Sequence, residues 1–305
     1  MTRRILLVVH TARSGALEVA TRIAGDLQEA GLEVSLAESE PGHALPPALA
    51  ALPVVAACEG SAAGHELAVV LGGDGTILRA TELCRGTDVP VLGVNLGHVG
   101  FLAEADVEDV HAVVEGVVAR DYAVEERITI DVDVRVDGQV VATNWALNEA
   151  SVEKASRERM LEVMAEIDGH PVSRWGCDGV VCATPTGSTA YNFSAGGPIV
   201  WPQVDALLMV PISAHALFAR PMVVSPESAM AVSVIGEHAT GVLWCDGRRA
   251  ADLPVGARVE VRRGRTPARL ARLHAAPFAT RLVRKFDLPV AGWRGAAERP
   301  ASEEA

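Results

Sequence analysis

The hydrophobic pattern of this 305-residue chain changes near Glu125. Before that point, short β-branched runs alternate with stretches whose apolar residues recur at helical spacing, which is typical of a parallel sheet covered by helices. After it, apolar and polar residues alternate along short runs separated by Asp-Gly pairs, which indicates antiparallel hairpins. The chain is therefore predicted to form an α/β domain followed by a mainly antiparallel β domain.

In the first part, we expect strands over residues 4–10, 32–37, 67–71 and 89–95. A helix is expected between the first two strands, with Ser14 as its N-cap and Gly31 in the left-handed conformation that ends it. A second helix is expected from Ile77 to Cys84. Residues 40–64 are rich in Pro, Gly and Ala, and they predict one or two short helices joined by loops.

In the second part, the run from Ile128 to Val136 leads into Asp137-Gly138, a strong hairpin signal. Further strands are expected over residues 160–167, 229–235, 241–245 and 258–262. A short helical pattern follows, which we expect to return to the first domain. The predicted organisation is a first domain over residues 1–124, a second over 125–275, a returning segment over 276–295 and a disordered tail over 296–305.

The chain carries 39 Asp and Glu against 27 Lys and Arg, a formal net charge of −12. This balance argues against a nucleic-acid partner, because affinity for a phosphate backbone requires clustered Lys and Arg. It is compatible with a small anionic ligand, which needs only a few local cations and backbone N–H groups. No apolar stretch approaches the roughly 20 residues that span a bilayer, and the first apolar run is too short for a secretory signal. We therefore expect a cytoplasmic protein without a membrane partner.

A glycine-rich loop with one carboxylate follows the apolar run at residues 67–71. It consists of Gly72, Gly73, Asp74, Gly75 and Thr76, and a helical stretch comes directly after it. Glycines allow a sharp turn and a close approach of the backbone to a ligand, and the N–H groups at a helix start bind phosphate oxygens. The spacing is neither that of a Walker A loop nor that of a dinucleotide fingerprint, and an ordinary turn with a helix cap stays an alternative.

Three further polar segments lie in the second part. Asn148-Glu149 ends an apolar run, Asp178 lies in a Gly-Cys-Asp-Gly segment before another, and residues 184–198 are dense in hydroxyl groups and small residues. A loop so rich in hydrogen-bonding groups is typical of a ligand site, with a flexible surface loop as the alternative.

In this order and spacing, the glycine-aspartate loop, the Asn-Glu pair, the second Asp-Gly and the Thr-Gly-Ser-Thr-Ala-Tyr-Asn segment resemble the NAD kinase family. The resemblance extends over about residues 4 to 295. It implies phosphorylation of the 2′-hydroxyl of the adenosine ribose of NAD to give NADP, with ATP or inorganic polyphosphate as donor. The loop alone would be shared with lipid and sugar kinases, and the later motifs separate the chain from them.

The resemblance also implies the roles of individual residues. Asp74 would accept the proton of the ribose hydroxyl, while Gly72, Gly73, Gly75 and Thr76 form the phosphate loop. Asn148 and Glu149 would hold the acceptor adenosine, and Asp178 would contact the nicotinamide side, reaching across a subunit boundary. The adenine site would be lined by Thr189, Ala190, Tyr191, Asn192, Phe193 and Ser194.

Candidate cations for the phosphates are Arg79, Arg159 and Arg248, each of which could equally be a solvated surface arginine. Arg79 lies at the family's spacing, whereas Arg248 stands where relatives often have Gln. His215 is interpreted as either a site residue or a structural histidine. The histidines form no ligand cluster, so no zinc site is expected, and the implied ion is Mg²⁺ held mainly by donor phosphates and water.

Two other functions stay open from the sequence: a catalytically inactive NADP(H)-binding regulator, and a lipid or sugar kinase that shares only the loop. The intact Asp74 and Gly75 argue against the first, and the Asn-Glu and Thr-Ala-Tyr motifs argue against the second. The sequence leaves open whether ATP or polyphosphate is the better donor. The family resemblance implies a homodimer or homotetramer.

Overall fold

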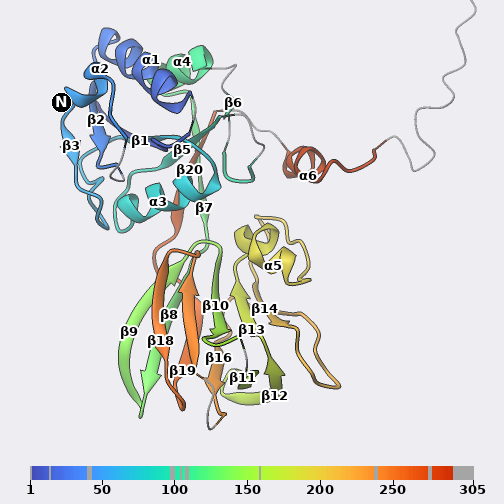
Figure 1. Cartoon of the computed structure of the whole chain (residues 1–305). Helices are drawn as coiled ribbons and strands as arrows, with labels where there is room; N and C mark the ends of the chain where they lie inside the picture. Colours follow the sequence, from blue (N-terminus) through green and yellow to red (C-terminus); the bar gives the residue numbers. More distant parts are fainter. Residues whose placement is uncertain are drawn as a thin grey trace, which may run out of the picture.

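A computed structural model describes residues 2–13, 15–39, 43–96, 100–103, 105–106, 110–157, 159–236, 240–273 and 277–290. The predicted N-cap Ser14 and the predicted tail over residues 296–305 lie outside these ranges, as do residues 291–295 of the returning segment. Figure 1 shows two bodies, one above the other, with helix α6 (Phe278–Phe286) to the right of the upper one.

The first body is built on an eight-stranded sheet in the order β3-β2-β1-β4-β5-β20-β7, with β6 paired to β5. The central strands pair in parallel, as the alternation of strand and helix patterns predicted, and β7 pairs antiparallel with β20. The strands are β1 (Arg4–Val9), β2 (Glu33–Ala37), β3 (Val54–Val55), β4 (Leu67–Leu71), β5 (Val91–Asn95), β6 (Ala105–Asp106), β7 (Ala123–Arg127) and β20 (Ala268–Arg272).

Helices cover both faces of this sheet (Figure 1). Helices α1 (Ala16–Glu29), α2 (Pro47–Ala50) and α4 (Val110–Ala119) pack on one face, and α3 (Asp74–Cys84) lies on the other. Gly31 has a φ of 83°, the left-handed conformation expected where the first helix ends. The predicted second helix begins three residues earlier than expected, because the Asp74-Gly75-Thr76 segment is already helical.

The second body consists of two six-stranded sheets packed around one apolar core. Their orders are β15-β14-β13-β10-β17-β18 and β12-β11-β16-β19-β8-β9, and all neighbouring strands run antiparallel. The strands are β8 (Ile130–Val136), β9 (Gln139–Ala146), β10 (Glu149–Lys154), β11 (Leu161–Ile167), β12 (His170–Cys177), β13 (Gly179–Ala183), β14 (Leu207–Ile212), β15 (Met222–Val224), β16 (Met230–Val234), β17 (Gly241–Cys245), β18 (Arg249–Leu253) and β19 (Arg258–Arg263).

Each predicted Asp-Gly hairpin is present. Asp137, Asp168 and Asp246 have φ values of 49°, 52° and 52°, and the glycine after each also has a positive φ. These are the conformations of a tight turn that matches the twist of the flanking strands, which is why the dipeptide is so informative.

The chain returns to the first body earlier than the sequence indicated. Strand β20 pairs with β5 and β7 in the first sheet, whereas residues up to 275 were predicted to belong to the second domain. The alternation of β20 resembles that of the preceding β strands, so the residues alone do not reveal which sheet they join. Helix α6 (Phe278–Phe286) follows, and both of these phenylalanines contact Phe101 of the first body. In the second body, Phe278 contacts Trp201 and Phe286 contacts Phe193.

The two bodies share an apolar cluster. Ile77 and Leu83 of α3 belong to the same cluster as Trp145 and Leu147, which end β9 and lead into β10. Helix α3 therefore lies between the first sheet and the second body. Among the described residues, no helix combines the length and the apolar character that a membrane crossing requires.

Candidate active site

The glycine loop joins the buried strand β4 to α3 at the carboxyl edge of the first sheet, the edge where open α/β sheets bind ligands. A Cβ atom on Gly72 would lie 2.4 Å from Oγ1 and 2.7 Å from Cβ of Thr76, so only glycine fits there. A Cβ on Gly75 would meet no atom within 4 Å. Gly72 is thus required by the fold, while Gly75 leaves open space beside the helix start.

Asp74 is the first residue of α3, and its carboxylate is held by the segment that follows the neighbouring strand β5. The backbone N–H groups of Phe101 and Leu102 donate to its Oδ2 and Oδ1, each at 3.2 Å. A Cβ on Gly100 would lie 2.3 Å from Asp74 Oδ1, so this segment approaches the carboxylate closely. Two neighbouring parallel strands end at the same edge, and this brings the two segments together.

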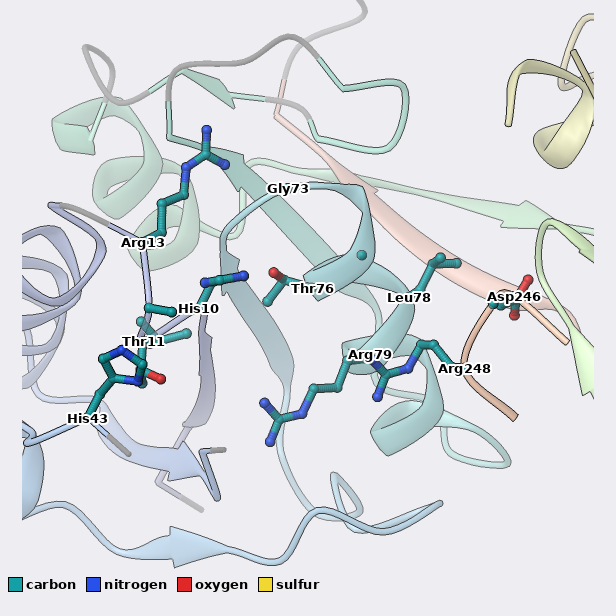
Figure 2. A pocket seen from close by; sticks show the side chains of 14 residues that line it. His10, Thr11, Arg13, His43, Gly73, Thr76, Leu78, Arg79, Asp246 and Arg248 are labelled. Carbon is teal, nitrogen blue, oxygen red and sulfur yellow. The ribbon is translucent and has the colours of Figure 1, made fainter. Parts of the chain in front are cut away.

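A cleft of about 600 Å³ opens beside the loop, and its lining includes Gly73, Gly75 and Thr76. Figure 2 shows Arg13, Arg79 and Arg248 approaching it from three different segments. Arg79 donates to the carbonyl oxygen of Glu38, and Arg248 forms an ion pair with Glu82 at 3.1 Å. The cleft therefore presents cations and loop N–H groups, the two features that bind phosphate.

The lining residues of this cleft that were not predicted include three with imidazole or guanidinium side chains, namely His10, Arg13 and His43. His10 and Arg13 follow β1, the strand next to β4, so they reach the same sheet edge as Asp74. The sequence signal was available, because the polar residues after the first strand occupy the same edge position as the glycine loop.

Asn148 and Glu149 lie at the start of β10, directly against the hydroxyl-rich segment. The N–H of Thr184 donates to the Asn148 carbonyl oxygen at 2.9 Å, and a Cβ on Gly187 would lie 2.0 Å from that same oxygen. Asp246, from the turn between β17 and β18, accepts the Asn148 N–H at 2.7 Å. The structure thus brings together the Asn-Glu pair and the Thr-Gly-Ser segment, which are far apart in the sequence.

Glu149 is 8% exposed and lines a second cavity of about 390 Å³ with Ser151, Glu153 and Tyr191. Its Oε2 atom has no hydrogen-bond partner within the described part of the chain. Burial and the nearby Asp246 carboxylate raise the pKa of Glu149 to about 8. A buried oxygen without a partner is costly, and a polar ligand group in this cavity would satisfy it.

The two cavities are adjacent, because Asp246 and Gly247 line both. A third cavity, of about 220 Å³, is lined by Phe101 and Leu102, which bind the Asp74 carboxylate, and by Thr189 and Phe278. Asp74 thus lies between the cation-lined cleft, which Gly73 and Gly75 line, and this third cavity.

Residues of the hydroxyl-rich segment line two different cavities. Tyr191 lines the Glu149 cavity and Thr189 the third cavity, with Ala190 partly buried between them. Phe193 packs on Phe286 of α6 with ring centroids 4.5 Å apart, and Ser194 is exposed. The segment forms a short 3₁₀ turn (Thr186–Thr189) and the one-turn helix α5 (Tyr191–Ser194).

Asn192 has a different position from its predicted neighbours in the adenine site. It is fully buried, and its Nδ2 donates to the carbonyl oxygens of Ser188 and Pro198 at 3.3 and 3.2 Å. A Cβ on Gly197 would lie 2.4 Å from that same nitrogen. The amide nitrogen therefore closes the loop from inside, while Oδ1 has no hydrogen-bond partner within the described residues.

Asp178, Arg159 and His215 lie away from Asp74. Asp178 precedes β13 and lies at the opposite end of the β10–β13 pair from Glu149, roughly 16 Å along the strand. Its carboxylate pairs with Lys154 at 2.5 Å, which lowers its pKa. Arg159 is exposed on the loop after β10, and the N–H of His215 donates to the carbonyl oxygen of Gly176. Within one copy of the chain, these residues form a separate group.

The described residues contain no group of three or more His, Cys, Asp and Glu side chains arranged to hold a metal ion. A divalent cation that is bound mainly by phosphates and water, with a single protein carboxylate, fits the donor set around Asp74 better than a protein cage does.

A carboxylate that can accept a hydroxyl proton, beside a cleft that can hold phosphates, places the chain among phosphotransferases with an alcohol acceptor. Family models specify the class: residues 5–122 match the ATP-NAD kinase N-terminal domain, and residues 147–273 match the ATP-NAD kinase C-terminal domain. The chain belongs to the NAD kinase family and is an enzyme of that class.

Curated relatives agree over almost the whole chain. The chain is 59% identical to NAD kinase 2 of Streptomyces avermitilis, over 96% of this chain and 97% of the relative. It is also 59% identical to the NAD kinase of Thermobifida fusca, over 97% and 93%.

Solved structures support the fold. An NAD kinase from Archaeoglobus fulgidus, solved in complex with ATP, is 26% identical with a TM-score of 0.72, covering 95% of this chain and all of that chain. Yeast NADH kinase, solved with NADH, is 24% identical with a TM-score of 0.79, covering 98% and 90%.

Proposed function

We propose that the chain phosphorylates the 2′-hydroxyl of the adenosine ribose of NAD, with Asp74 as the proton acceptor. The observation that carries the proposal is that two cavities meet beside the glycine loop. Asp246 and Gly247 line both the pocket of Glu149 and the cation-lined cleft, and Gly73 and Gly75, the neighbours of the Asp74 carboxylate, also line that cleft. A phosphoryl donor in the cleft and a nucleoside in the pocket would meet at this carboxylate.

Asp74 would act mainly by orientation. Phosphoryl transfer passes through a loose transition state, so catalysis depends on in-line positioning and on neutralisation of charge. The two N–H donors from Phe101 and Leu102 fix both carboxylate oxygens, while one lone pair on each oxygen is left for an incoming hydroxyl. The hydroxyl proton would move to Asp74 as the ribose oxygen bonds to the donor's terminal phosphorus. The bond between that phosphorus and the bridging oxygen would break, and ADP or a shortened polyphosphate would leave.

Glu149 and Asn148 would hold the acceptor nucleoside. The unpartnered Glu149 Oε2 lies in a pocket beside the ring of Tyr191, which is 36% exposed and offers a face on which a base can stack. With its raised pKa, Glu149 carries a proton at neutral pH for much of the time and can donate to a ribose or base acceptor.

The donor would be a nucleoside triphosphate or polyphosphate in the 600 Å³ cleft. Arg13, Arg79 and Arg248 approach its phosphates from different sides, and the loop N–H groups bind the group nearest Asp74. The ATP in the archaeal neighbour supports a nucleotide donor. We assign Mg²⁺ to this site, where it would be held mainly by donor phosphates and water and would neutralise phosphate charge.

Asp178 would contribute to the pocket of a partner subunit in a homodimer or homotetramer. It lies at the opposite end of the β10–β13 pair from Glu149, and exposed Met160, Leu217 and Phe218 lie on loops near the same end of the second body. Light scattering of the purified chain tests this: a monomer at micromolar concentration would contradict it.

The deciding experiment incubates the purified chain with NAD, Mg²⁺ and either ATP or polyphosphate, and measures NADP with glucose-6-phosphate dehydrogenase. We expect NADP only when donor and cation are both present. Formation of no NADP with either donor would refute the kinase proposal, and a parallel reaction with NADH defines the acceptor.

A further inference from the structure

The turn between β17 and β18 carries a buried carboxylate that serves the Asn-Glu pair. Asp246 accepts the N–H groups of Leu147, Asn148 and Glu149 at 2.9, 2.7 and 3.4 Å, and its own N–H donates to the Glu149 carbonyl oxygen at 2.9 Å. Its side chain is 2% exposed. One carboxylate therefore fixes the backbone of three consecutive residues, two of which carry the proposed acceptor contacts.

Arg249 holds this carboxylate from the other side. Its Nη2 donates to Asp246 Oδ2 at 3.1 Å and to the Trp145 carbonyl oxygen at 2.7 Å, and its guanidinium lies 4.5 Å from the centre of the Trp145 ring. A planar guanidinium can make these contacts at once, whereas an ammonium cannot.

Glu82 connects Arg249 to the helix that carries Asp74. Its carboxylate accepts from Nη1 of Arg249 and from Nε of Arg248. Glu82 lies in the last turn of α3, eight residues after Asp74, which is roughly 12 Å along a rigid helix. A continuous set of ion pairs and hydrogen bonds thus runs from α3 in the first body to the Asn-Glu pair in the second.

We propose that Glu82, Arg249 and Asp246 are positioning residues that set the acceptor pocket at the correct distance and angle from Asp74. The proposal rests on the proposed function, because it assigns the acceptor nucleoside to the pocket of Asn148 and Glu149. Asp246 fixes the pocket itself, and the Arg249–Glu82 pair fixes the pocket relative to the catalytic helix. The two parts predict different kinetic effects.

The test compares D246N, E82Q, R249K and R249Q in the full chain. For each variant, kcat and the KM for NAD are measured separately, and NADP affinity is measured by calorimetry. In D246N, the side-chain amide has only one acceptor oxygen for the N–H groups that both carboxylate oxygens of Asp246 accept. We therefore expect NADP affinity to fall and the KM for NAD to rise, each about tenfold. In E82Q the pocket stays intact but its orientation relaxes, so we expect kcat to fall about tenfold with NADP affinity within about twofold. R249K should show a smaller loss of kcat than R249Q.

The matched control is E162Q, which breaks an ion pair with Arg174 on the surface of the second body and should change none of these quantities. The double variant E82Q/R249Q should lose no more kcat than whichever of the two single variants loses more. The proposal is overturned if E82Q behaves like E162Q in kcat, or if E82Q and R249Q reduce kcat additively. If D246N does not fold, the variants at the partly buried Glu82 and Arg249 decide alone. Failure of the kinase proposal would appear separately, as absence of NADP formation by the unaltered chain.

Discussion

The carboxylate of Asp74 and the backbone N–H of Leu102, 3.2 Å apart, join the start of helix α3 to the segment after strand β5. This contact and the neighbouring one from the Phe101 N–H orient the Asp74 carboxylate. The sequence motif identifies this residue but does not reveal its orientation.

D74N is expected to lower kcat by about 100-fold or more, because an amide cannot accept the hydroxyl proton. NADP affinity measured by calorimetry should stay within about threefold, since the acceptor pocket is built by other residues. Turnover close to that of the unaltered chain would remove Asp74 from its proposed role.

Gly72 and Gly75 offer a matched pair of substitutions within one loop. G72A should lower the free energy of unfolding by about 1–3 kcal/mol, because the new Cβ overlaps Thr76. G75A meets no atom, so it should fold at least as stably and still lose activity, since its methyl group would occupy space beside the phosphate loop. Urea unfolding together with kcat distinguishes the two. Equal stabilities would contradict the packing argument.

Glu149 predicts a pH-dependent stability. Its pKa in the folded chain is about 8 against an ordinary value of 4.5, so its contribution to stability is full below about 4.5 and is lost as pH rises through 8. E149Q lacks this titration. The unfolding free energy of E149Q relative to the unaltered chain should therefore increase between pH 5 and pH 9, by an amount on the order of a few kcal/mol. A difference that stays constant over this range would show that Glu149 titrates normally.

R79Q should raise the KM for the phosphoryl donor about tenfold, because it removes a cation from the cleft beside the glycine loop. The KM for NAD should change by less than about twofold, since Arg79 does not line the pocket of Glu149 that is assigned to the acceptor. R174Q, on the surface of the second body, is the control. An unchanged donor KM would place the phosphates elsewhere.

The local elements were largely predictable from the sequence. Alternating residues with Asp137-Gly138, Asp168-Gly169 and Asp246-Gly247 identified the hairpins, because an Asp-Gly pair tolerates the positive φ values that such turns require. Residues 268–272 were predicted as part of the second domain, and the strand they form pairs with β5 and β7 of the first sheet. Sequence patterns indicate that a segment is a strand but not which partner it pairs with.

The predicted site residues divide in space. Gly75 and Arg79 lie at the cation-lined cleft, while Glu149 and Tyr191 line the pocket beside it. Asp178 lies at the far end of a strand, and Asn192 is turned inward to close its loop. Spacing along the chain carries no information about which end of a hairpin faces a ligand, so these two positions required the fold.

The sequence by itself determined the family and the two architectures, and it singled out Asp74 as the candidate carboxylate, since all three depend on local patterns and contiguous motifs. The tertiary structure decided how the cation-lined cleft and the pocket of Glu149 meet. Asp246 was visible in the sequence only as part of a turn, yet in the fold it is buried against residues almost a hundred positions away and linked through Arg249 to Glu82. Hydrogen bonds between distant segments follow from strand pairing and domain packing, which no local pattern specifies.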